Sequence, residues 1–373
     1  MKLEFPQRKL LAAFSALLAL AGGAHAGDAF LAGIKHHTVL VNTVPDNGDQ
    51  NPYAIVVSPI TSGKIKAGDV LVDNFNNAAN LQGMGSTIVN YHPDSKSLTL
   101  FAQIPRTLAQ CPGGVGLSTA MTVLKSGWVI VGSTPSNDGT TDTKGAGCLM
   151  VLDTEGKLVD VWSGPDINDP WGNMAVIDNG DKATLFVSNA GFGVGSAKGT
   201  PPVINQATVL RLDLEIPAGK PPKVVNRTVV ASGFGEQADK SVFLVGPTGL
   251  VYSKDDKLYV TDALGNRISE IWDATSRTTS AGIGRTLTHD GLLLRPLALT
   301  VTPQGHLLAT NGSNGKVVEI DPANGDQLGA RWIDANKAQT PPGNGDLFGI
   351  ALTPEGDGFY YVTDDNNNLV LAK

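Results

Sequence analysis

The sequence is poor in cysteine, aromatic residues and charge. Its 373 residues include two cysteines, 6% Phe, Trp and Tyr, and 17% charged residues, against about 25% charged residues in an average soluble domain. Acidic residues outnumber basic ones and the formal net charge is −7, which argues against a nucleic-acid-binding surface. No CxxC, HxH, HxxxH or HExxH spacing occurs, so no local motif predicts a redox or zinc site.

Long apolar runs are missing outside the N-terminus, so we expect no membrane insertion. The N-terminus itself is typical of a secretory signal peptide: three cations among the first nine residues, the apolar run Leu10–Leu20, and the small-x-small pattern Ala24–Ala26. We therefore expect cleavage after Ala26, a domain over residues 27–373, and a protein that is secreted or periplasmic. The residue directly after the expected cleavage site is Gly27, so no cysteine stands there to accept a lipid.

Turn-forming residues are abundant, with 44 glycines and 22 prolines. Between them the chain repeats one pattern: an apolar run, a tight turn, a second β-rich run ending in Asp, Asn or Ser, and then an alternating third run. This spacing favours strands over helices. The six copies are Ile55–Asn74, Gly116–Ser133, Gly172–Asn189, Thr248–Ala263, Pro296–Asn311 and Phe348–Asp365.

The copies recur every 49 to 73 residues, with room for about four strands each. A period of this size is typical of a β-propeller, in which neighbouring sheets bury each other's faces. We therefore predict an all-β, six-bladed propeller with four-stranded blades, in one domain. The last copy ends after about three strands, while His37–Val44 is a strand without a place in the repeats. We expect this N-terminal strand to complete blade six.

One repeat carries a family resemblance. Val260–Trp272 (VTDALGNRISEIW) closely resembles the core of an NHL repeat, and Ala309–Asp321 and Val362–Lys373 are similar to degenerate copies of it. The resemblance implies a six-bladed propeller, related in architecture to gluconolactonase-like and virginiamycin B lyase-like proteins, and it does not choose among binding modules, lactonases and lyases. Within the repeat, we expect Asp262 and Asp364 to accept hydrogen bonds from the turn that follows each.

Blades one to three are predicted to have long connections from the second to the third strand, namely Asn74–Gly85, Thr134–Gly147 and Ala190–Gln206. In a propeller these connections lie on the face where the inner strands begin. Long loops on a rigid sheet scaffold commonly carry binding residues. We therefore expect a ligand or a protein partner to bind this face.

The two cysteines fall at the same face, Cys111 before the inner strand of blade two and Cys148 at the start of its third strand. In an oxidising compartment we expect them to form a disulfide, which would fix the Thr134–Gly147 loop. Two free thiols are the alternative.

Metal-assisted chemistry at the channel mouth is the enzymatic alternative. Lactonase-like propellers hold a divalent cation there with Glu, Asn and Asp, and the lyases rely on histidines, but this sequence matches neither pattern cleanly. Asn173 and Asp346 are the weak candidates for a metal such as Ca²⁺ or Zn²⁺, and a nearby Arg295 would oppose a cation. The candidate catalytic residues are Asn173, His289, Asp290, Arg295 and Asp346; Asn51 and Thr248 also fall at inner-strand starts.

The remaining histidines, His36, His37, His92 and His306, are scattered over the repeats and are expected at the surface or in turns. No GxSxG elbow marks a nucleophile. The sequence thus leaves three alternatives open: a monomeric module that binds a small molecule, protein or peptide through its loop face; a metal-assisted lactonase, hydrolase or lyase; and a structural envelope protein.

Overall fold

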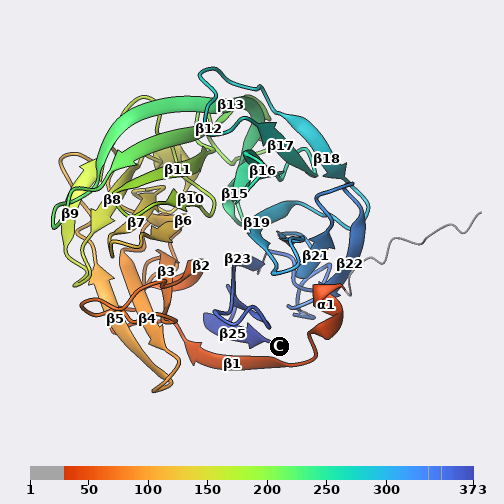
Figure 1. Cartoon of the computed structure of the whole chain (residues 1–373), viewed down its shortest axis with the longest axis horizontal. Coiled ribbons are helices and arrows are strands. Elements are labelled where there is room, and N and C mark those ends of the chain that lie inside the picture. Colours follow the sequence, from red (N-terminus) through yellow and green to blue (C-terminus); the bar gives the residue numbers. More distant parts are fainter. Residues whose placement is uncertain (1–28, 335, 346) are drawn as a thin grey trace, which may run out of the picture.

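A computed structural model describes residues 29–334, 336–345 and 347–373. The predicted signal peptide and Asp346 therefore lie outside the described residues. The chain folds into six antiparallel sheets arranged around a common centre (Figure 1). The prediction of an all-β, six-bladed propeller is confirmed.

In each of the first five blades the strands run from the centre outwards in chain order. Blade one is β2 (Gln50–Val57), β3 (Val70–Asn76), β4 (Thr87–His92) and β5 (Ser97–Gln103); blade two is β6 (Leu117–Val123), β7 (Val129–Ser133), β8 (Cys148–Leu152) and β9 (Leu158–Trp162). Blade three is β10 (Ala175–Asp178), β11 (Lys182–Asn189), β12 (Ile204–Glu215) and β13 (Lys223–Asp239), with the short β14 (Phe243–Val245) added to β13.

Blades four and five follow the same plan. Blade four is β15 (Pro247–Ser253), β16 (Lys257–Asp262), β17 (Arg267–Trp272) and β18 (Arg285–His289); blade five is β19 (Pro296–Val301), β20 (Leu307–Asn311), β21 (Lys316–Ile320) and β22 (Gln327–Trp332). Blade six contains β23 (Leu347–Leu352), β24 (Phe359–Thr363) and β25 (Asn368–Ala372) from the C-terminus.

The fourth strand of blade six is β1 (His37–Asn42), which comes from the other end of the chain. It pairs antiparallel with β25, from His37 opposite Ala372 to Asn42 opposite Asn368, so the predicted closure is confirmed (Figure 1). The two ends of the described chain are also joined directly, because the Lys35 N–H donates to the Lys373 carbonyl at 2.8 Å.

A short helix, α1 (Phe30–Gly33), precedes β1 and docks on blade five. The backbone N–H groups of Phe30 and Leu31 donate to the two carboxylate oxygens of Glu319, each at 2.8 Å. Glu319 is fully buried and also contacts His306 Nδ1 at 2.7 Å. The segment ahead of the closing strand is therefore held in place by a buried carboxyl group as well as by apolar contacts.

The strands form because alternate side chains of each blade pack against the blade on either side. Among the described residues, one apolar cluster fills each of the six gaps between neighbouring blades, and a seventh lies at the centre. This two-sided burial explains why β3 and β6 are buried at every position.

Blade three departs from the expected repeat. β12 and β13 are 12 and 17 residues long, and β14 adds a fifth strand that no repeat pattern indicated. The predicted loop Ala190–Gln206 ends earlier than expected, since β12 begins at Ile204. These additions account for the longest spacing between repeats, which separates blades three and four.

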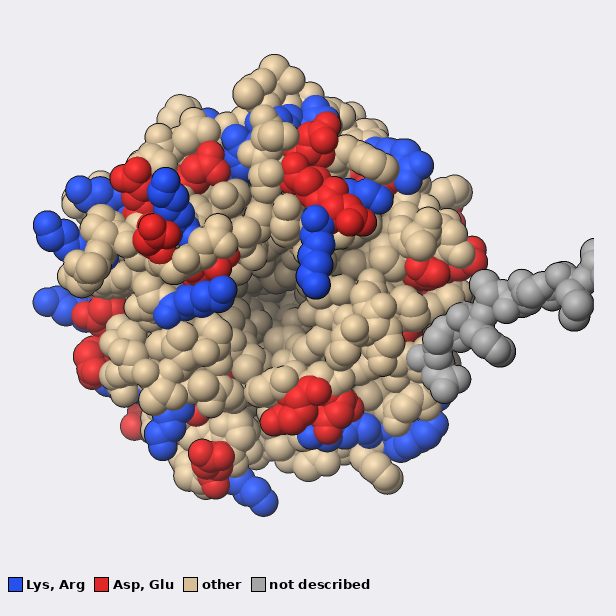
Figure 2. Space-filling view, viewed as in Figure 1, with Lys and Arg blue, Asp and Glu red and all other residues tan. Residues whose placement is uncertain are grey.

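Acidic and basic side chains are interspersed around a central hollow on the face that Figure 2 presents. Within the described part of the chain, no helix has the length and apolar character needed to cross a membrane.

Because β1 pairs with β25, we expect its loss to open the ring. A chain that starts at residue 43 should show a lower thermal unfolding midpoint and should self-associate, since the edge of β25 would be free to pair with another chain. Thermal melts and size-exclusion chromatography check this. The control chain starts at residue 29 and should match the full domain; equal behaviour of the two truncated chains would contradict the role of β1.

Candidate functional site

The central channel is closed by an aromatic plug. Tyr53 stacks between Phe75 and Phe348, with ring centroids 4.5 and 4.0 Å away, and Trp171 meets both Tyr53 and Phe75 edge-on. Phe243 of β14 packs against Phe75 at 5.6 Å. These side chains are almost fully buried. They leave no space for a ligand at the level of the plug, so a candidate site is expected at the ends of the channel.

A polar cavity of about 610 Å³ lies at one end of the channel, and we call it the mouth pocket. Its walls come from the start of β2, the end of β3 and the loop that follows it, the turn between β24 and β25, and the connection between β13 and β14. The lining residues are Gln50, Asn51, Asn76, Asn80, Leu81, Gln82, Gly139, Lys240, Ser241, Asp364, Asp365, Asn366 and Asn367.

Ring closure assembles this pocket from the two ends of the chain. The backbone N–H of Asn51 in blade one donates to the Oδ1 of Asn367 in blade six at 2.6 Å. The Thr43 N–H, just after the closing strand, donates to the Asn367 carbonyl at 2.7 Å. Asn51 adopts a left-handed backbone conformation with φ 64°, which asparagine tolerates better than most residues.

Two asparagines that line the pocket have buried side-chain oxygens without a partner. Asn51 and Asn76 are 4% and 3% exposed, yet the Oδ1 atom of each accepts no hydrogen bond. The other side of the Asn76 amide is engaged, because its Nδ2 donates to Asn80 Oδ1 at 2.7 Å. Leaving a buried acceptor unsatisfied costs about 1–3 kcal/mol, so this arrangement is suited to a solute that donates hydrogen bonds.

Asp364 adds a carboxylate to the same pocket. Burial, together with the nearby carboxylates of Asp365 and Asp334, raises its pKa to about 7. Among the described residues none donates a hydrogen bond to the Asp364 carboxylate. Asp262, its counterpart in blade four, instead accepts the Gly265 N–H at 2.9 Å. The expected turn-capping role is therefore seen at Asp262, whereas Asp364 is free for a ligand.

The connection between β13 and β14 is held over the mouth by an ion pair. Arg295 binds the carboxylate of Asp239. Burial raises the pKa of Asp239, but hydrogen bonds from Ser241 and Arg295 outweigh it and hold the pKa at about 2. On the other side, Gln82 Nε2 donates to the Ser241 carbonyl at 2.7 Å. The long loop of blade one thus meets this connection across the pocket.

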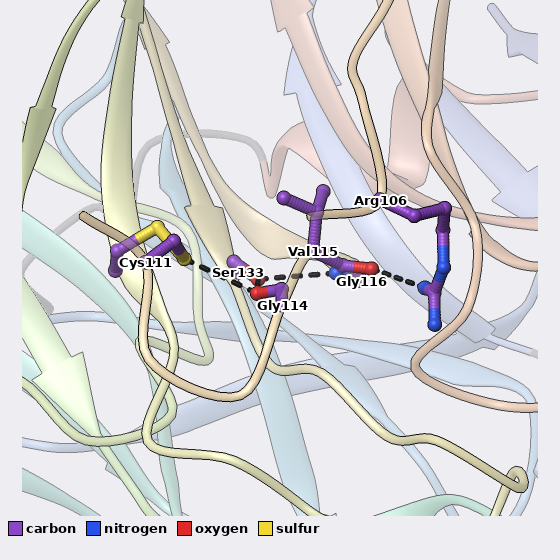
Figure 3. Close-up of a disulfide and its surroundings, with 7 residues drawn as sticks. Arg106, Cys111, Gly114, Val115, Gly116 and Ser133 are labelled. Carbon is purple, nitrogen blue, oxygen red and sulfur yellow. Dashed lines mark hydrogen bonds between the residues drawn. A yellow bond between two sulfur atoms is a disulfide. The ribbon is translucent and has the colours of Figure 1, made fainter. Parts of the chain in front are cut away.

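The long loops of blades one and two are held together near a disulfide. Cys111 and Cys148 are bonded, with Cα atoms 5.2 Å apart, so the predicted pairing is confirmed. Beside it, Ser133 Oγ accepts the Gly116 N–H at 3.0 Å (Figure 3).

Arg106 joins the two loops directly. Its guanidinium donates to the carbonyl of Val115, seen in Figure 3, and to those of Gly83 at 3.2 Å and Ser136 at 2.9 Å. Since Gly83 and Ser136 belong to different blades, one half-buried guanidinium holds both loops, and the loop face is preorganised.

A second charged cluster lies under the long loop of blade three. Lys144 Nζ is 2.9 Å from Asp169 Oδ2, and both side chains are largely buried. Glu236 is fully buried nearby; its Oε2 accepts the Phe192 N–H at 3.1 Å and its Oε1 has no partner. Burial raises the pKa of Glu236, and although the Phe192 N–H and Lys144 oppose the rise, the pKa reaches about 8, with Asp169 adding to the increase.

Of the sequence candidates for catalysis, His289, Asp290 and Arg295 are linked by hydrogen bonds, and Asn173 is engaged separately. The Asn173 amide is engaged by backbone: its Nδ2 donates to the carbonyls of Leu250 and Leu299 and its Oδ1 accepts the Leu299 N–H, all within 3.1 Å. His289 and Asp290 pair with each other at 2.7 Å on the exposed end of β18.

Arg295 is joined to Asp290 through Asn266, whose Oδ1 accepts the Arg295 N–H and whose Nδ2 donates to Asp290 Oδ1. Asp346 lies outside the described residues, so its part in the site stays a prediction. Within the part of the chain that the structure describes, no three His, Cys, Asp or Glu residues are grouped as metal ligands.

Of the residues at inner-strand starts, Asn51 is the one that lines the mouth pocket. Sequence reasoning did not single out Asn76, Asn366 or Asn367 as site residues. The signal that could have found them is the concentration of asparagines in two segments, Asn74–Asn80 and Asn366–Asn368. The first covers the end of the second strand of blade one, and the second lies at the turn from the second to the third strand of blade six, which packs beside blade one.

The fold and the mouth pocket together define a six-bladed β-propeller with a preorganised polar site over a plugged channel. No protein-family model matches the chain, and no curated protein matches its sequence. The resemblance to NHL repeats therefore stays a prediction.

Solved structures do share the fold. The chain is similar to a gluconolactonase from Xanthomonas campestris, at 13% identity and a TM-score of 0.52, covering 90% of this chain and 88% of that one. It is also similar to virginiamycin B lyase from Staphylococcus aureus, at 15% identity and a TM-score of 0.50, covering 91% and 99%. At such identities the likeness is one of architecture.

The raised pKa of Glu236 predicts a pH-dependent stability. A carboxyl whose pKa rises from an ordinary 4.5 to about 8 on folding keeps its proton in the folded state, so its contribution is complete below pH 4.5 and is lost as the pH rises through about 8. Glu236→Gln stays neutral at every pH. It should therefore reduce the fall in melting temperature between pH 5 and pH 9.

The matched control is Glu215→Gln, which changes an exposed carboxylate at the end of β12 and should leave that fall unchanged. Asp169, whose pKa is raised to about 7 by burial against the opposing effect of Lys144, and Asp364, whose pKa is also raised to about 7, should contribute to the pH dependence that remains. An unchanged pH profile in Glu236→Gln would contradict the prediction.

Proposed function

We propose that this protein is an exported β-propeller that binds a small polar ligand in the mouth pocket. The observation that carries the proposal is the pair of buried, unpartnered oxygens on Asn51 and Asn76 lining a 610 Å³ cavity. Buried polar groups in folded proteins are normally hydrogen-bonded. A ligand with hydroxyl or amine donors would satisfy both oxygens at once.

The lining narrows the ligand class. Carboxamides dominate it, from Gln50, Asn51, Asn76, Asn80, Gln82, Asn366 and Asn367. A carboxamide both donates and accepts, as does a hydroxyl group, so the pocket suits a polyhydroxylated molecule such as a sugar or a sugar derivative. The volume falls in the range of about 300–1,000 Å³ common for small-molecule sites.

The surroundings support a binding role. The pocket lies on the face with the long loops, which Arg106 and the Cys111–Cys148 disulfide hold in place. Preorganised loops lose little conformational entropy on binding. A protein or peptide that presents a polar side chain to the pocket is the other partner compatible with this surface. We propose that the protein acts as a monomer.

Export is part of the proposal. The N-terminal pattern supports a signal peptide cleaved after Ala26, and the disulfide suits an oxidising compartment. Cleavage there would make Gly27 the new N-terminus, three residues ahead of the start of α1. The secreted or periplasmic protein would then display its loop face freely.

A metal-assisted lactonase, hydrolase or lyase is the second candidate, favoured by the Asp364 carboxylate in the same pocket lining as Asn51 and Asn76. Hard cations such as Ca²⁺ take oxygen ligands of these types. The structural likeness to a gluconolactonase and to a lyase agrees with this candidate at the level of the fold. Asp346 would be an additional ligand if it lies at this mouth.

For the binding proposal, we expect at least one member of a panel of monosaccharides, polyols and sugar lactones to raise the melting temperature of the mature protein. Asn51→Gly, which suits the left-handed backbone there, and Asn76→Ala should each weaken that ligand about tenfold, since each removes one hydrogen bond. Titration calorimetry measures the affinities.

Asn324→Ala, on an exposed turn of blade five, is the control and should bind as the wild type does. If no member of the panel raises the melting temperature, the proposed class of ligand is contradicted. If a ligand binds all variants equally well, the proposal that it binds in the mouth pocket is contradicted.

For the metal-assisted candidate, elemental analysis should find about one divalent cation per chain, and EDTA should lower the melting temperature. Asp364→Asn should abolish that EDTA effect, because it removes the carboxylate ligand. If the protein contains no metal and its melting temperature does not change with EDTA, Ca²⁺ or Zn²⁺, this candidate is contradicted. The binding module would then be the remaining proposal.

A further inference from the structure

The charged cluster under the long loop of blade three holds a lysine beside a carboxyl group in the interior. Lys144 lies in the long loop of blade two, and Asp169 lies in the connection from β9 to β10. Their side chains are 10% and 0% exposed, and Lys144 Nζ is 2.9 Å from Asp169 Oδ2. Among the described residues, each of the three other lysine–carboxylate pairs has a more exposed lysine. An amine and a carboxyl group are thus held together away from water.

The pair is incompletely satisfied as an ion pair. A buried ion pair is stable when further hydrogen bonds satisfy its remaining polar atoms. Asp169 Oδ1 is buried without a hydrogen-bond partner, and Oδ2 is closely confined, because a Cβ atom on Gly191 would lie 2.1 Å from it. Burial raises the pKa of Asp169 to about 7 against the opposing effect of Lys144. The neutral acid is therefore populated at neutral pH beside the lysine.

The pair of Lys257 and Glu270 in blade four is different. Lys257 Nζ is 3.0 Å from Glu270 Oε1, and the Glu270 side chain is fully buried. Its Oε2 also contacts Arg285 and accepts the Trp272 Nε1–H. Burial raises the pKa of Glu270, but hydrogen bonds from Lys257 and Arg285 outweigh it and hold the pKa below its ordinary value. This carboxylate stays charged, and a carboxylate resists nucleophilic attack at its carbon.

A second carboxyl group accompanies Lys144 and Asp169. Glu236 is fully buried, its Oε2 accepts the Phe192 N–H at 3.1 Å, and its Oε1 has no partner. Phe192 follows Gly191, which packs against Asp169, so adjacent residues of one loop contact both carboxyl groups. Burial, opposed by the Phe192 N–H and Lys144, raises the pKa of Glu236 to about 8. Glu236 therefore keeps a proton that it can transfer.

An acceptor for an amide N–H is already in place. Lys144 Nζ donates to Asn168 Oδ1 at 3.4 Å. If Nζ became an amide nitrogen, it would keep one N–H for this oxygen. Replacing two buried opposite charges with one neutral, hydrogen-bonded amide removes the cost of desolvating the ions. The neutral product therefore suits this interior better than the ion pair does.

We propose that Lys144 and Asp169 become joined in the folded protein by an amide bond between Nζ and Cγ. A proton first passes from the Lys144 ammonium to the Asp169 carboxylate. The neutral amine then attacks Cγ, while the Glu236 acid donates its proton to the carboxyl oxygen and takes one from the nitrogen. The bond from Cγ to a hydroxyl group breaks and one water leaves. Atoms and charge balance without a further reactant.

The bond would add a second covalent link at the loop face. It would tie the long loop of blade two to the connection that enters blade three, close in sequence to the Cys111–Cys148 disulfide. Asp169 no longer titrates once it is an amide, so its contribution to the pH dependence of stability belongs to the unlinked chain. The proposal does not rest on ligand binding at the mouth pocket.

The test is the intact mass of the purified mature protein after reduction of its disulfide, followed by sequencing of its proteolytic peptides. We expect a mass lower than the calculated one by one water, and a linked pair of peptides joined at Lys144 and Asp169. Lys144→Arg should show its full calculated mass, because the guanidinium keeps the charge and does not form this bond. Asp169→Asn should still link, losing ammonia in place of water. Lys257→Arg is the matched control and should retain the water loss.

Glu236→Gln should slow formation of the bond at least about 100-fold and be purified mainly unlinked. Thermal melts establish that each variant is folded. A wild-type protein of full mass would overturn the proposal. So would a water loss at another residue, such as a succinimide at Asp138–Gly139, which mild alkali opens whereas the amide persists. A fully linked Glu236→Gln protein would overturn the role given to Glu236.

Discussion

The pairing of β1 with β25 is the constraint on which the rest of the structure depends. A propeller blade buries both faces only when it has a neighbour on each side, so an open ring would expose blades one and six. Closure by the N-terminal strand supplies the last pairing. It also makes Asn51 and Asn367 hydrogen-bonding neighbours, although 316 residues separate them. The mouth pocket is thus a product of closure.

The second determinant is the way the centre is filled. Stacked aromatic rings close the channel, and a segment that follows β13 brings Phe243 to the plug and Lys240 and Ser241 to the pocket wall. Polar groups at the mouth consequently sit on an apolar floor, where burial raises the pKa of Asp364 to about 7. Desolvated amides and a proton-retaining carboxyl make this a site for directed hydrogen bonds.

Much of the fold could be predicted because it repeats. Turn residues and alternating strands indicated six blades, and an unassigned strand indicated the closure. The disulfide followed from where the repeats place Cys111 and Cys148. The site was harder to predict, because its polar groups converge from blades one and six and from an insertion in blade three that follows no repeat. Asn173 illustrates the difficulty: its position at an inner strand suggested a ligand role, and its amide instead bridges the backbones of two neighbouring strands.

The central claim is that Asn51 and Asn76, which line the mouth pocket, hold side-chain oxygens that no protein group satisfies. A crystal structure of the purified mature protein at a resolution that orients side-chain amides tests it most directly. We predict that both Oδ1 atoms accept hydrogen bonds from a bound solute or from ordered water inside the mouth pocket. If protein groups satisfy both oxygens and the loop of blade one or the segment after β13 fills the cavity, the account of this site is contradicted.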